Sequence, residues 1–415
     1  MKFVRVSMLL SLLFLTYTFT FSQTLVSSAL NGTMPASELN ERMNKSYGSY
    51  AVPETSTPVQ LYKITYTSLD VNNKKVNLTG LVAWPIGGAP KGLVVFCHGT
   101  TVDRDRSPSK FKGTGEAPET IEAITGFATG GYAVIMPDYL GLGDHKAAHP
   151  YPLNKVNAAS GRDMISAART LAREKNYNIA KQLYITGYSE GGGVAMALTQ
   201  SLQSYMNEQY QVTASAPASG PYDLSGTTRK FMLEETGQQV GFITRLYLIS
   251  YATNFLRKEK GRKLTEYYKP VLANALYLKY LGNPTDEGLI KQIGLTTVLM
   301  RSKNRLSNVL QPGFLADMKA NRTSNPFLRM LRENDVYDWT VTRPMLMINV
   351  DKDSIVSPAN TEIAYNAMRR RGVSPTTLRR LVLPDTLNHL TGVAPAMSKA
   401  RAFFDGGFSS VPEAQ

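Results

Sequence analysis

The chain has 415 residues, of which 43% are hydrophobic and 19% are charged. This composition is typical of a globular chain and not of a disordered one, and the length suits one large domain with an insertion, or two domains. The formal net charge is +14, from 46 basic and 32 acidic residues. Basic clusters lie at residues 257–263 and 368–371, but no recognised nucleic-acid-binding module accompanies them. We therefore expect a solvated basic face rather than a site for a polyanion.

The first residues match the layout of a secretory signal peptide. A short basic start precedes an apolar stretch at residues 8–21, and residues 20–22 place small side chains at the two positions that a signal peptidase reads. The apolar stretch is short for a membrane span, so an uncleaved anchor is the less favoured interpretation. We predict a signal peptide over residues 1–22 and a mature protein that is secreted or periplasmic, with no stable membrane span.

Cys97 is the only cysteine of the chain, so we expect no internal disulfide. An exported protein without disulfides is typical of bacteria and depends on its hydrophobic core for stability. Because no base or metal ligand adjoins Cys97 in the sequence, we expect a buried strand residue there rather than a nucleophile. No cysteine lies near residue 22, which excludes lipid attachment at a new N-terminal cysteine.

The segment after the signal peptide is polar and rich in turn-forming residues. We predict a leader over residues 23–58 that packs loosely over the surface. Apolar and polar side chains then alternate over residues 59–67 and 75–84, with Asn72 and Asn73 at a turn between them. This period of two predicts an antiparallel pair of strands at the edge of a sheet.

From residue 92 onward, strand-like runs alternate with helical patterns, and the first run, at residues 92–97, is apolar throughout. A run that is apolar at every position is expected for a strand with both faces covered, as in a parallel sheet. We predict an α/β fold with a mostly parallel sheet and helices on both faces. The expected strands lie at residues 92–97, 132–136, 183–186, 210–215, 344–350 and 378–383, and the expected helices at 118–129, 160–175, 361–371 and 397–404.

One long segment interrupts this alternation with a purely helical pattern. Its apolar residues recur at helical spacing, for example over residues 240–249 and 271–281. We predict a helical cap or lid at residues 221–338, inserted between two parts of an α/β core at residues 59–220 and 339–415. The apolar stripes of these helices are expected to form core rather than a binding surface.

One stretch of the predicted sheet carries a catalytic signature. Residues 187–191 spell Gly-Tyr-Ser-Glu-Gly, a Gly-x-Ser-x-Gly motif between a strand-like run and a helix-like run. In such a nucleophile elbow the serine occupies a strained turn, its hydroxyl projects from the sheet, and glycines let strand and helix approach. We predict Ser189 as a nucleophile rather than an ordinary turn residue, and the N–H of Glu190 as an oxyanion donor.

A serine hydroxyl needs a base, and the chain has only four histidines. His389 follows the last expected strand, at the end of the sheet where open α/β folds place their functional groups, so a plain surface role is less favoured. The imidazole needs a carboxylate partner, and both Asp351 and Asp353 follow the strand expected at 344–350. We favour Asp353 as this carboxylate, because the chain turns into a helix after it, and Asp351 is the alternative.

The developing oxyanion needs a second preorganised N–H donor. We expect it from the loop after the strand that ends at Cys97. Gly99 lets the backbone of this loop approach the serine, and the N–H of Thr100 is the candidate donor. His98 would then support the loop rather than act as the base.

The order of these residues along the chain resembles the α/β-hydrolase superfamily: His98-Gly99-Thr100, the motif at 187–191, Asp353 and His389. More narrowly, the sequence is similar to the secretory lipase group and to bacterial serine esterases. That similarity is carried by Pro-Asp-Tyr-Leu-Gly-Leu-Gly-Asp at residues 137–144, His-Pro-Tyr at 149–151 and Gly-Pro-Tyr-Asp-Leu at 220–224. The resemblance implies ester hydrolysis through an acyl-enzyme, with a Ser-His-Asp triad and a lid over the acyl pocket.

Asp138, Tyr139, Asp144 and His145 are expected to form a structural turn, because their spacing does not suit a transition metal. We therefore expect neither a metal nor another cofactor. The expected ligand is a small-molecule or lipid ester, with no nucleic acid, and the sequence carries no signal of oligomeric state. A serine peptidase or amidase on the same fold is the first alternative, and a non-catalytic hydrolase-like binding protein is the second.

Overall fold

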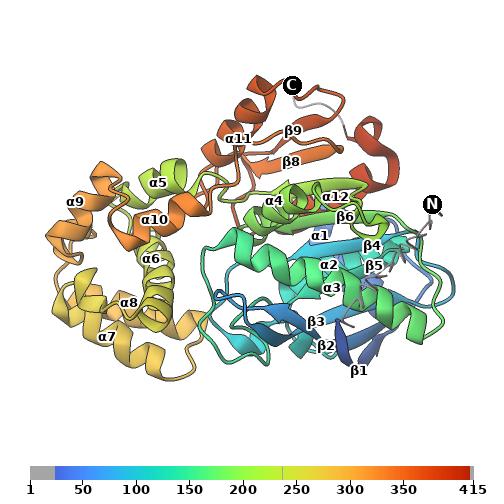
Figure 1. Ribbon diagram of the computed structural model, residues 1–415, viewed down its shortest axis with the longest axis horizontal. Coiled ribbons are helices and arrows are strands. Elements are labelled where there is room, and N and C mark those ends of the chain that lie inside the picture. Colours follow the sequence, from blue (N-terminus) through green and yellow to red (C-terminus); the bar gives the residue numbers. More distant parts are fainter. Residues whose placement is uncertain (1–23, 236, 412–415) are drawn as a thin grey trace, which may run out of the picture.

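The computed structural model of the protein describes residues 24–235 and 237–411. The predicted signal peptide at residues 1–22 lies outside the described residues. A nine-stranded sheet with the order β1-β2-β3-β5-β4-β6-β7-β8-β9 forms the centre of the α/β part (Figure 1). Its strands are β1 (Leu25–Met34), β2 (Val59–Leu69), β3 (Lys75–Pro85), β4 (Leu93–Cys97), β5 (Ala133–Pro137), β6 (Leu183–Tyr188), β7 (Ala214–Ala218), β8 (Met345–Val350) and β9 (Leu378–Leu383).

The sheet is parallel in its larger part. Strands β4 to β9 run parallel to one another, whereas β1, β2 and β3 pair antiparallel, and β3 joins the parallel part through an antiparallel contact with β5. The predicted α/β fold with a mostly parallel sheet is therefore confirmed. The antiparallel pair predicted at residues 59–67 and 75–84 is present as β2 and β3, although β1 rather than β2 forms the edge.

Helices cover both faces of the sheet (Figure 1). Val94 and Phe96 of β4 belong to the core on one face, and Val95 and Cys97 to the core on the other. This division of one strand between two cores explains why its sequence is apolar at every position. The first face packs against α1 (Ala36–Tyr47), α2 (Pro118–Phe127) and α12 (Val393–Gly406), and the second against α3 (Asn154–Glu174), α4 (Glu190–Leu202) and α11 (Ala359–Arg370).

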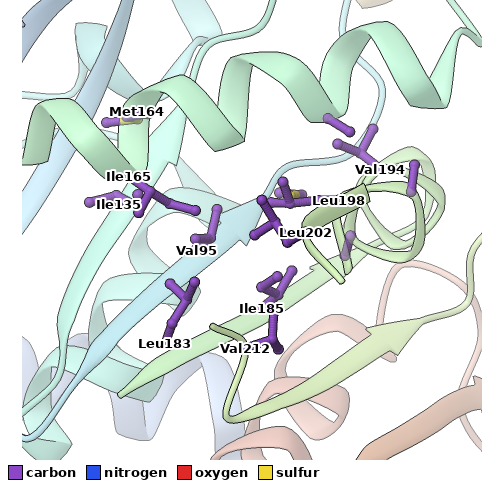
Figure 2. Packing of buried hydrophobic residues seen from close by; sticks show 14 of the residues in the cluster. Val95, Ile135, Met164, Ile165, Leu183, Ile185, Val194, Leu198, Leu202 and Val212 are labelled. Carbon is purple, nitrogen blue, oxygen red and sulfur yellow. The ribbon is translucent and has the colours of Figure 1, made fainter. Parts of the chain in front are cut away.

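The core beneath α3 and α4 is tightly filled with aliphatic side chains. Val95 of β4 and Ile185 of β6 lie in the same buried cluster as Ile165 of α3 and Leu198 of α4 (Figure 2). Burying one such side chain stabilises a fold by about 1.5–3 kcal/mol. This packing therefore fixes the positions of the strands and of the loops at their carboxyl ends. Cys97, at the end of β4, is buried as predicted.

The segment at residues 24–58 differs from the loose leader that the sequence predicted. It forms the edge strand β1 and then α1, in which Leu39, Met43 and Tyr47 are buried. The Tyr47 hydroxyl also donates to the carbonyl oxygen of Glu122 in α2 (2.7 Å). The prediction was wrong because most of β1 faces solvent at the sheet edge, so its sequence lacks the alternation of a half-buried strand.

The strand expected at residues 210–215 is also displaced along the chain. The observed β7 starts at Ala214 and consists of small residues, Ala-Ser-Ala-Pro-Ala, which have little intrinsic preference for strands. Helices approach this strand on both faces. Its alanines are buried in the core on the α12 side, and a Cβ on Gly192 of α4 would lie 2.2 Å from the carbonyl oxygen of Ala218. These tertiary contacts outweigh the local β propensity of Tyr210 and Val212.

The helices between β7 and β8 form the cap, which lies to the left of the sheet in Figure 1. They share a buried core to which Leu246, Leu272 and Leu289 contribute, in agreement with the expectation for their apolar stripes. Leu278 and Leu281 are nevertheless 68% and 57% exposed, so part of the apolar stripe of α7 lies outside that core. The cap helices are α5 (Arg229–Leu233), α6 (Gln239–Lys260), α7 (Pro270–Leu281), α8 (Asp286–Leu299), α9 (Pro312–Ala320) and α10 (Pro326–Glu333). Within residues 24–235 and 237–411, none of the helices has both the length and the hydropathy of a bilayer-spanning segment.

Candidate active site

Strand β6 and helix α4 meet at Ser189, where the backbone adopts φ 58° and ψ −125°. This conformation costs a non-glycine residue about 1–3 kcal/mol and persists only where neighbours enforce it. The Ser189 N–H donates to the carbonyl oxygen of Ala218 (3.1 Å), and the Gly192 N–H donates to the carbonyl oxygen of Ser189 (2.9 Å). A sharp strand-to-helix turn is therefore present at the motif, with Ser189 at its apex.

The two glycines of the motif are required by the close approach of the backbone around them. A Cβ on Gly191 would lie 1.9 Å from the carbonyl oxygen of Cys97, and a Cβ on Gly187 would lie 2.4 Å from that of Gly191. Both distances are far inside van der Waals contact, so a side chain at either position would push α4 away from the sheet.

His389 lies in the loop after β9, and its imidazole bridges two side chains. Nε2 is 2.9 Å from Oγ of Ser189, and Nδ1 is 2.6 Å from Oδ2 of Asp353. Because an ionised carboxylate only accepts hydrogen bonds, Nδ1 carries a proton and Nε2 is left to accept from the serine hydroxyl. The structure thus brings together the three side chains that the sequence analysis selected as a triad.

Asp353 lies in the loop after β8, and the backbone that follows it fixes its orientation. Oδ1 accepts the N–H groups of Ile355 (2.9 Å) and Val356 (2.8 Å), which leaves Oδ2 for His389. The Asp353 side chain is only 1% exposed, and low exposure strengthens its attraction to a protonated imidazole. Asp351, the alternative from the sequence, lies exposed at the surface.

The two predicted oxyanion donors come from neighbouring segments. Glu190 is the first residue of α4, where no carbonyl of the helix is available to its N–H. The loop after β4 passes directly beside the serine, because a Cβ on Gly99 would lie 3.6 Å from Cβ of Ser189. Thr100 follows Gly99 in this loop, so both predicted amides belong to the surroundings of Ser189.

Glu119 of α2 is a site residue that the sequence analysis missed. Both of its carboxyl oxygens accept the N–H of Gly99, at 2.8 and 3.0 Å. Burial of the carboxyl group raises its pKa to about 8, and the charges of Glu122 and Glu190 add to this rise, while the Gly99 N–H opposes it. At pH 7 the carboxyl group of Glu119 is therefore largely protonated, and it anchors the loop through the Gly99 N–H. Gly99 and Glu119 are 20 residues apart, and no local motif connects them.

A second missed feature is a buried pair behind the start of α4. Oε1 of Glu190 is 2.9 Å from Nε2 of His149 and 3.2 Å from Nδ2 of Asn157. Nδ1 of His149 lies 2.8 Å from the carbonyl oxygen of Leu140, so Nδ1 carries a proton and a second proton lies between Nε2 and Glu190. The sequence analysis noted His149 only as part of a motif. The pair holds the side chain of the residue whose N–H is a predicted oxyanion donor.

His98 contacts the backbone of the loop after β4 and does not lie in the line of contacts of the triad. Its ring stacks on Tyr139 with centroids 4.2 Å apart, and its Nδ1 is 2.7 Å from the carbonyl oxygen of Gly99. Burial lowers the pKa of His98, and its Nε2 lies 3.3 Å from the carbonyl oxygen of Asp138. These surroundings agree with the expectation that His98 supports the loop and is not the base.

The residues of the expected structural turn bind protein groups. Oδ2 of Asp138 accepts from the Thr79 hydroxyl (2.5 Å) and Oδ1 from the Ser109 N–H (2.8 Å). Asp144 forms ion pairs with two lysines, and Nδ1 of His145 accepts the N–H of Gly141. In the described part of the chain, no group of three His, Cys, Asp or Glu side chains is arranged to hold a metal ion.

Comparison with known families matches part of the chain. The family described as secretory lipase matches residues 107–236, a segment that includes Ser189, Glu190 and His149. No curated protein matches the sequence at a significant level. The chain thus resembles the secretory lipases over the part of the core that carries the elbow.

Solved structures share the architecture over nearly the whole chain. A Legionella pneumophila protein described only as a candidate hydrolase has a TM-score of 0.80 at 25% identity and covers 94% of this chain and 100% of its own. The rice cell wall degrading esterase LipA of Xanthomonas oryzae has a TM-score of 0.76 at 22% identity, covering 92% and 98%. Lipase A of Candida antarctica has a TM-score of 0.62 at 16% identity, covering 95% and 84%. The chain has the α/β-hydrolase fold, and these findings support a hydrolase of the lipase or esterase type.

Proposed function

We propose that this protein is a serine carboxylester hydrolase that acts through an acyl-enzyme. The observation that carries the proposal is the line of contacts from Asp353 through His389 to Ser189, at 2.6 and 2.9 Å. A serine in a strained turn, a neutral imidazole within hydrogen-bond distance and a buried carboxylate behind it are the parts that nucleophilic catalysis by serine requires. The resemblance to the secretory lipases favours carboxylic esters as the substrate class.

In the first half of the reaction, Oγ of Ser189 attacks the ester carbonyl carbon while Nε2 of His389 takes the hydroxyl proton. The carbonyl π bond opens and its electron pair moves to oxygen, which gives a tetrahedral oxyanion. When that intermediate collapses, the bond to the alkoxy group breaks and His389 returns the proton to the leaving alcohol. A water molecule, deprotonated by His389, then attacks the acyl-enzyme and releases the carboxylic acid and Ser189.

The remaining groups have separate tasks. Asp353 orients the imidazole and stabilises its cation, because Oδ2 accepts from Nδ1. The backbone N–H groups of Glu190 and Thr100 would donate to the oxyanion, and one such donor contributes about 100- to 1000-fold to the rate. Glu119 and His149 hold the two segments that carry these donors.

The proposal includes an exported location. The signal peptide predicted at residues 1–22 directs the chain across the membrane and is removed, so the working enzyme is secreted or periplasmic. N-terminal sequencing of the protein recovered from culture medium and from periplasm tests this part. Recovery of uncleaved protein in the cytoplasm alone would contradict it.

Hydrolysis of p-nitrophenyl esters with acyl chains from acetate to palmitate tests the reaction, with Ser189→Ala as the control. We expect turnover by the natural protein and loss of turnover in the variant, and the preferred chain length separates esterase from lipase. Labelling by a fluorophosphonate without hydrolysis of any ester would redirect the assignment to a serine peptidase or amidase. Neither labelling nor hydrolysis would leave a non-catalytic binding protein.

A further inference from the structure

A cap residue, Asp286, binds the loop that carries the predicted oxyanion donor. Its Oδ2 accepts from the Thr101 hydroxyl (2.7 Å), and its Oδ1 accepts the backbone N–H of Val102 (2.7 Å). Asp286 is the first residue of helix α8 and lies 185 residues after Thr101 in the sequence. The side chain is 16% exposed, so the contacts are mostly shielded from solvent.

A second cap helix, α6, binds the same loop. The Tyr251 hydroxyl donates to the carbonyl oxygen of Thr101 (2.8 Å), and the Tyr247 hydroxyl donates to Oδ1 of Asp286 (2.7 Å). Both tyrosines are buried. The hydroxyl and carbonyl of Thr101 and the N–H of Val102 are therefore all bound by the cap, and Asp286 accepts two of these three bonds and the bond from Tyr247.

The orientation of Asp286 is not explained by the needs of its own helix. The N-terminal cap of α8 is Thr285, whose side chain accepts the N–H of Gly288 (3.1 Å). Glu287, the other acid of the first turn, is exposed and suffices for a favourable interaction with the helix dipole. The carboxylate of Asp286 instead points to the loop after β4. There it also forms an ion pair with Arg106, whose Nη1 lies 3.8 Å from Oδ2.

These contacts place Thr100 between two anchors. On one side, Glu119 of the core binds the N–H of Gly99. On the other side, the cap binds Thr101 and Val102 through Asp286 and Tyr251. Nδ1 of His98 also lies 2.7 Å from the carbonyl oxygen of Gly99, which belongs to the same peptide unit as the Thr100 N–H. The backbone is thus held by the core on one side of Thr100 and by the cap on the other.

We propose that Asp286 is a positioning residue that couples the cap to the oxyanion hole by holding residues 101–102. The inference rests on the proposed ester hydrolysis for its catalytic consequence. With Asp286 in place, the Thr100 N–H is preorganised for the oxyanion, and an amide that must be ordered during the reaction stabilises it less. A cap displaced from the loop would leave the triad intact but would weaken this donor.

Two variants and a matched control test the proposal. Asp286→Ala removes both acceptors, Asp286→Asn keeps one, and Glu287→Ala removes an exposed acid from the adjacent position of the same helix turn. Hydrogen exchange of the backbone amides at residues 98–103 should speed up in Asp286→Ala, less in Asp286→Asn, and not in Glu287→Ala. This measurement needs no substrate, so it tests the coupling even if no ester is hydrolysed.

Kinetics test the catalytic consequence. We expect Asp286→Ala to lower kcat on a short p-nitrophenyl ester by about 10- to 100-fold, because small displacements of a catalytic group have effects of that size. KM should change by less than about threefold, since the donor acts mainly on the transition state. The affinity for a trifluoromethyl ketone, which forms a tetrahedral oxyanion with the serine, should fall in parallel with kcat/KM. Asp286→Asn should recover part of both losses.

Two results would overturn the proposal. If the Asp286 variants match Glu287→Ala in hydrogen exchange at residues 98–103, Asp286 does not hold the loop. If they match it in kcat and in affinity for the trifluoromethyl ketone, the loop contact does not act on the oxyanion, even if the melting temperature falls. If the natural protein itself hydrolyses no ester, the proposed function fails, and the hydrogen-exchange comparison still decides whether the coupling exists.

Discussion

The α/β core and the cap differ in how completely they bury their apolar side chains. Strands β4, β6 and β8 are buried at every position, because helices cover the sheet on both faces. Helices α7 and α8 leave Leu278 and Leu299 at 68% and 76% exposure. Ser189 and Asp353, which need a fixed geometry, follow the fully buried strands β6 and β8. Among its contacts with the core, the cap binds the loop at residues 101–102, so substitutions in the two regions should have effects of different kind and size.

The largest effect is expected at the apex of the elbow. Ser189→Ala should lower kcat/KM for esters by at least about 10⁴-fold, because removal of a triad nucleophile leaves only oxyanion stabilisation and binding. The unfolding transition should change little, since the hydroxyl contributes one hydrogen bond to His389. The measurements are p-nitrophenyl ester kinetics and thermal unfolding. Retention of ester turnover in a pure Ser189→Ala preparation would exclude Ser189 as the nucleophile.

Replacing glycine by alanine should lower the stability of the protein in the core and raise it in the cap. In the core, Gly191→Ala should destabilise the protein by about 3 kcal/mol or more, because the added Cβ would meet the Cys97 carbonyl oxygen at 1.9 Å. In the cap, Gly313→Ala in α9 adds a Cβ that meets nothing within 4 Å. It should stabilise the protein by up to about 1 kcal/mol, because alanine loses less entropy than glycine in a helix.

Urea unfolding of both variants measures this contrast, with the natural protein as the reference. Equal effects at Gly191 and Gly313 would mean that α4 is not pressed against the sheet as described. A large loss at Gly313 would mean that α9 is more closely packed than its open glycine indicates.

A pH-dependent effect on stability is expected at Glu119. Its pKa is raised from about 4.5 to about 8, so the folded state binds a proton that the unfolded state has lost in this window. The stability of the natural protein should therefore fall as the pH rises from about 4.5 to about 8, whereas Glu119→Gln, which does not titrate, avoids this loss. The advantage of the variant should grow over that window and level off above about pH 8.

Urea midpoints at pH 5, 7 and 9 measure this difference. Glu116→Gln, at an exposed position shortly before α2, controls for the loss of one acidic side chain. In Glu119→Gln, the amide oxygen of the substituted side chain would still accept the N–H of Gly99, so ester turnover at pH 7 should persist. A stability difference of the same size at all three pH values would show that Glu119 is ionised in the folded protein at neutral pH.

The parts that the sequence predicted share a strong local signal. Continuous apolar runs identified β4, β5 and β8, and the motif at residues 187–191 identified the turn at Ser189. The positions of Asp353 and His389 followed from the rule that functional loops leave the carboxyl ends of strands. In each case, a few neighbouring residues carry enough information to define the local structure.

The parts that the sequence missed depend on contacts between distant residues. The edge strand β1 has no regular alternation and is ordered by its pairing with β2, and the small residues of β7 are buried between helices on both faces. Glu119 acts on Gly99 from 20 residues away, and Asp286 on Thr101 from 185 residues away. Neither distance produces a periodicity or a motif, so only the folded chain reveals these two anchors of the oxyanion loop.

The smallest effect is expected on the outer face of the cap. Leu278→Gln in α7 should change the free energy of unfolding by no more than about 0.5 kcal/mol, because the side chain is already 68% exposed. Leu276→Gln, two residues earlier on the same helix, places a polar group where the leucine is 1% exposed and should cost at least about 2 kcal/mol. Urea unfolding of the pair, in one buffer, separates the two faces of α7. If Leu278→Gln is as destabilising as Leu276→Gln, the outer face of the cap is covered in solution, and the contrast between a closed core and an open cap does not hold.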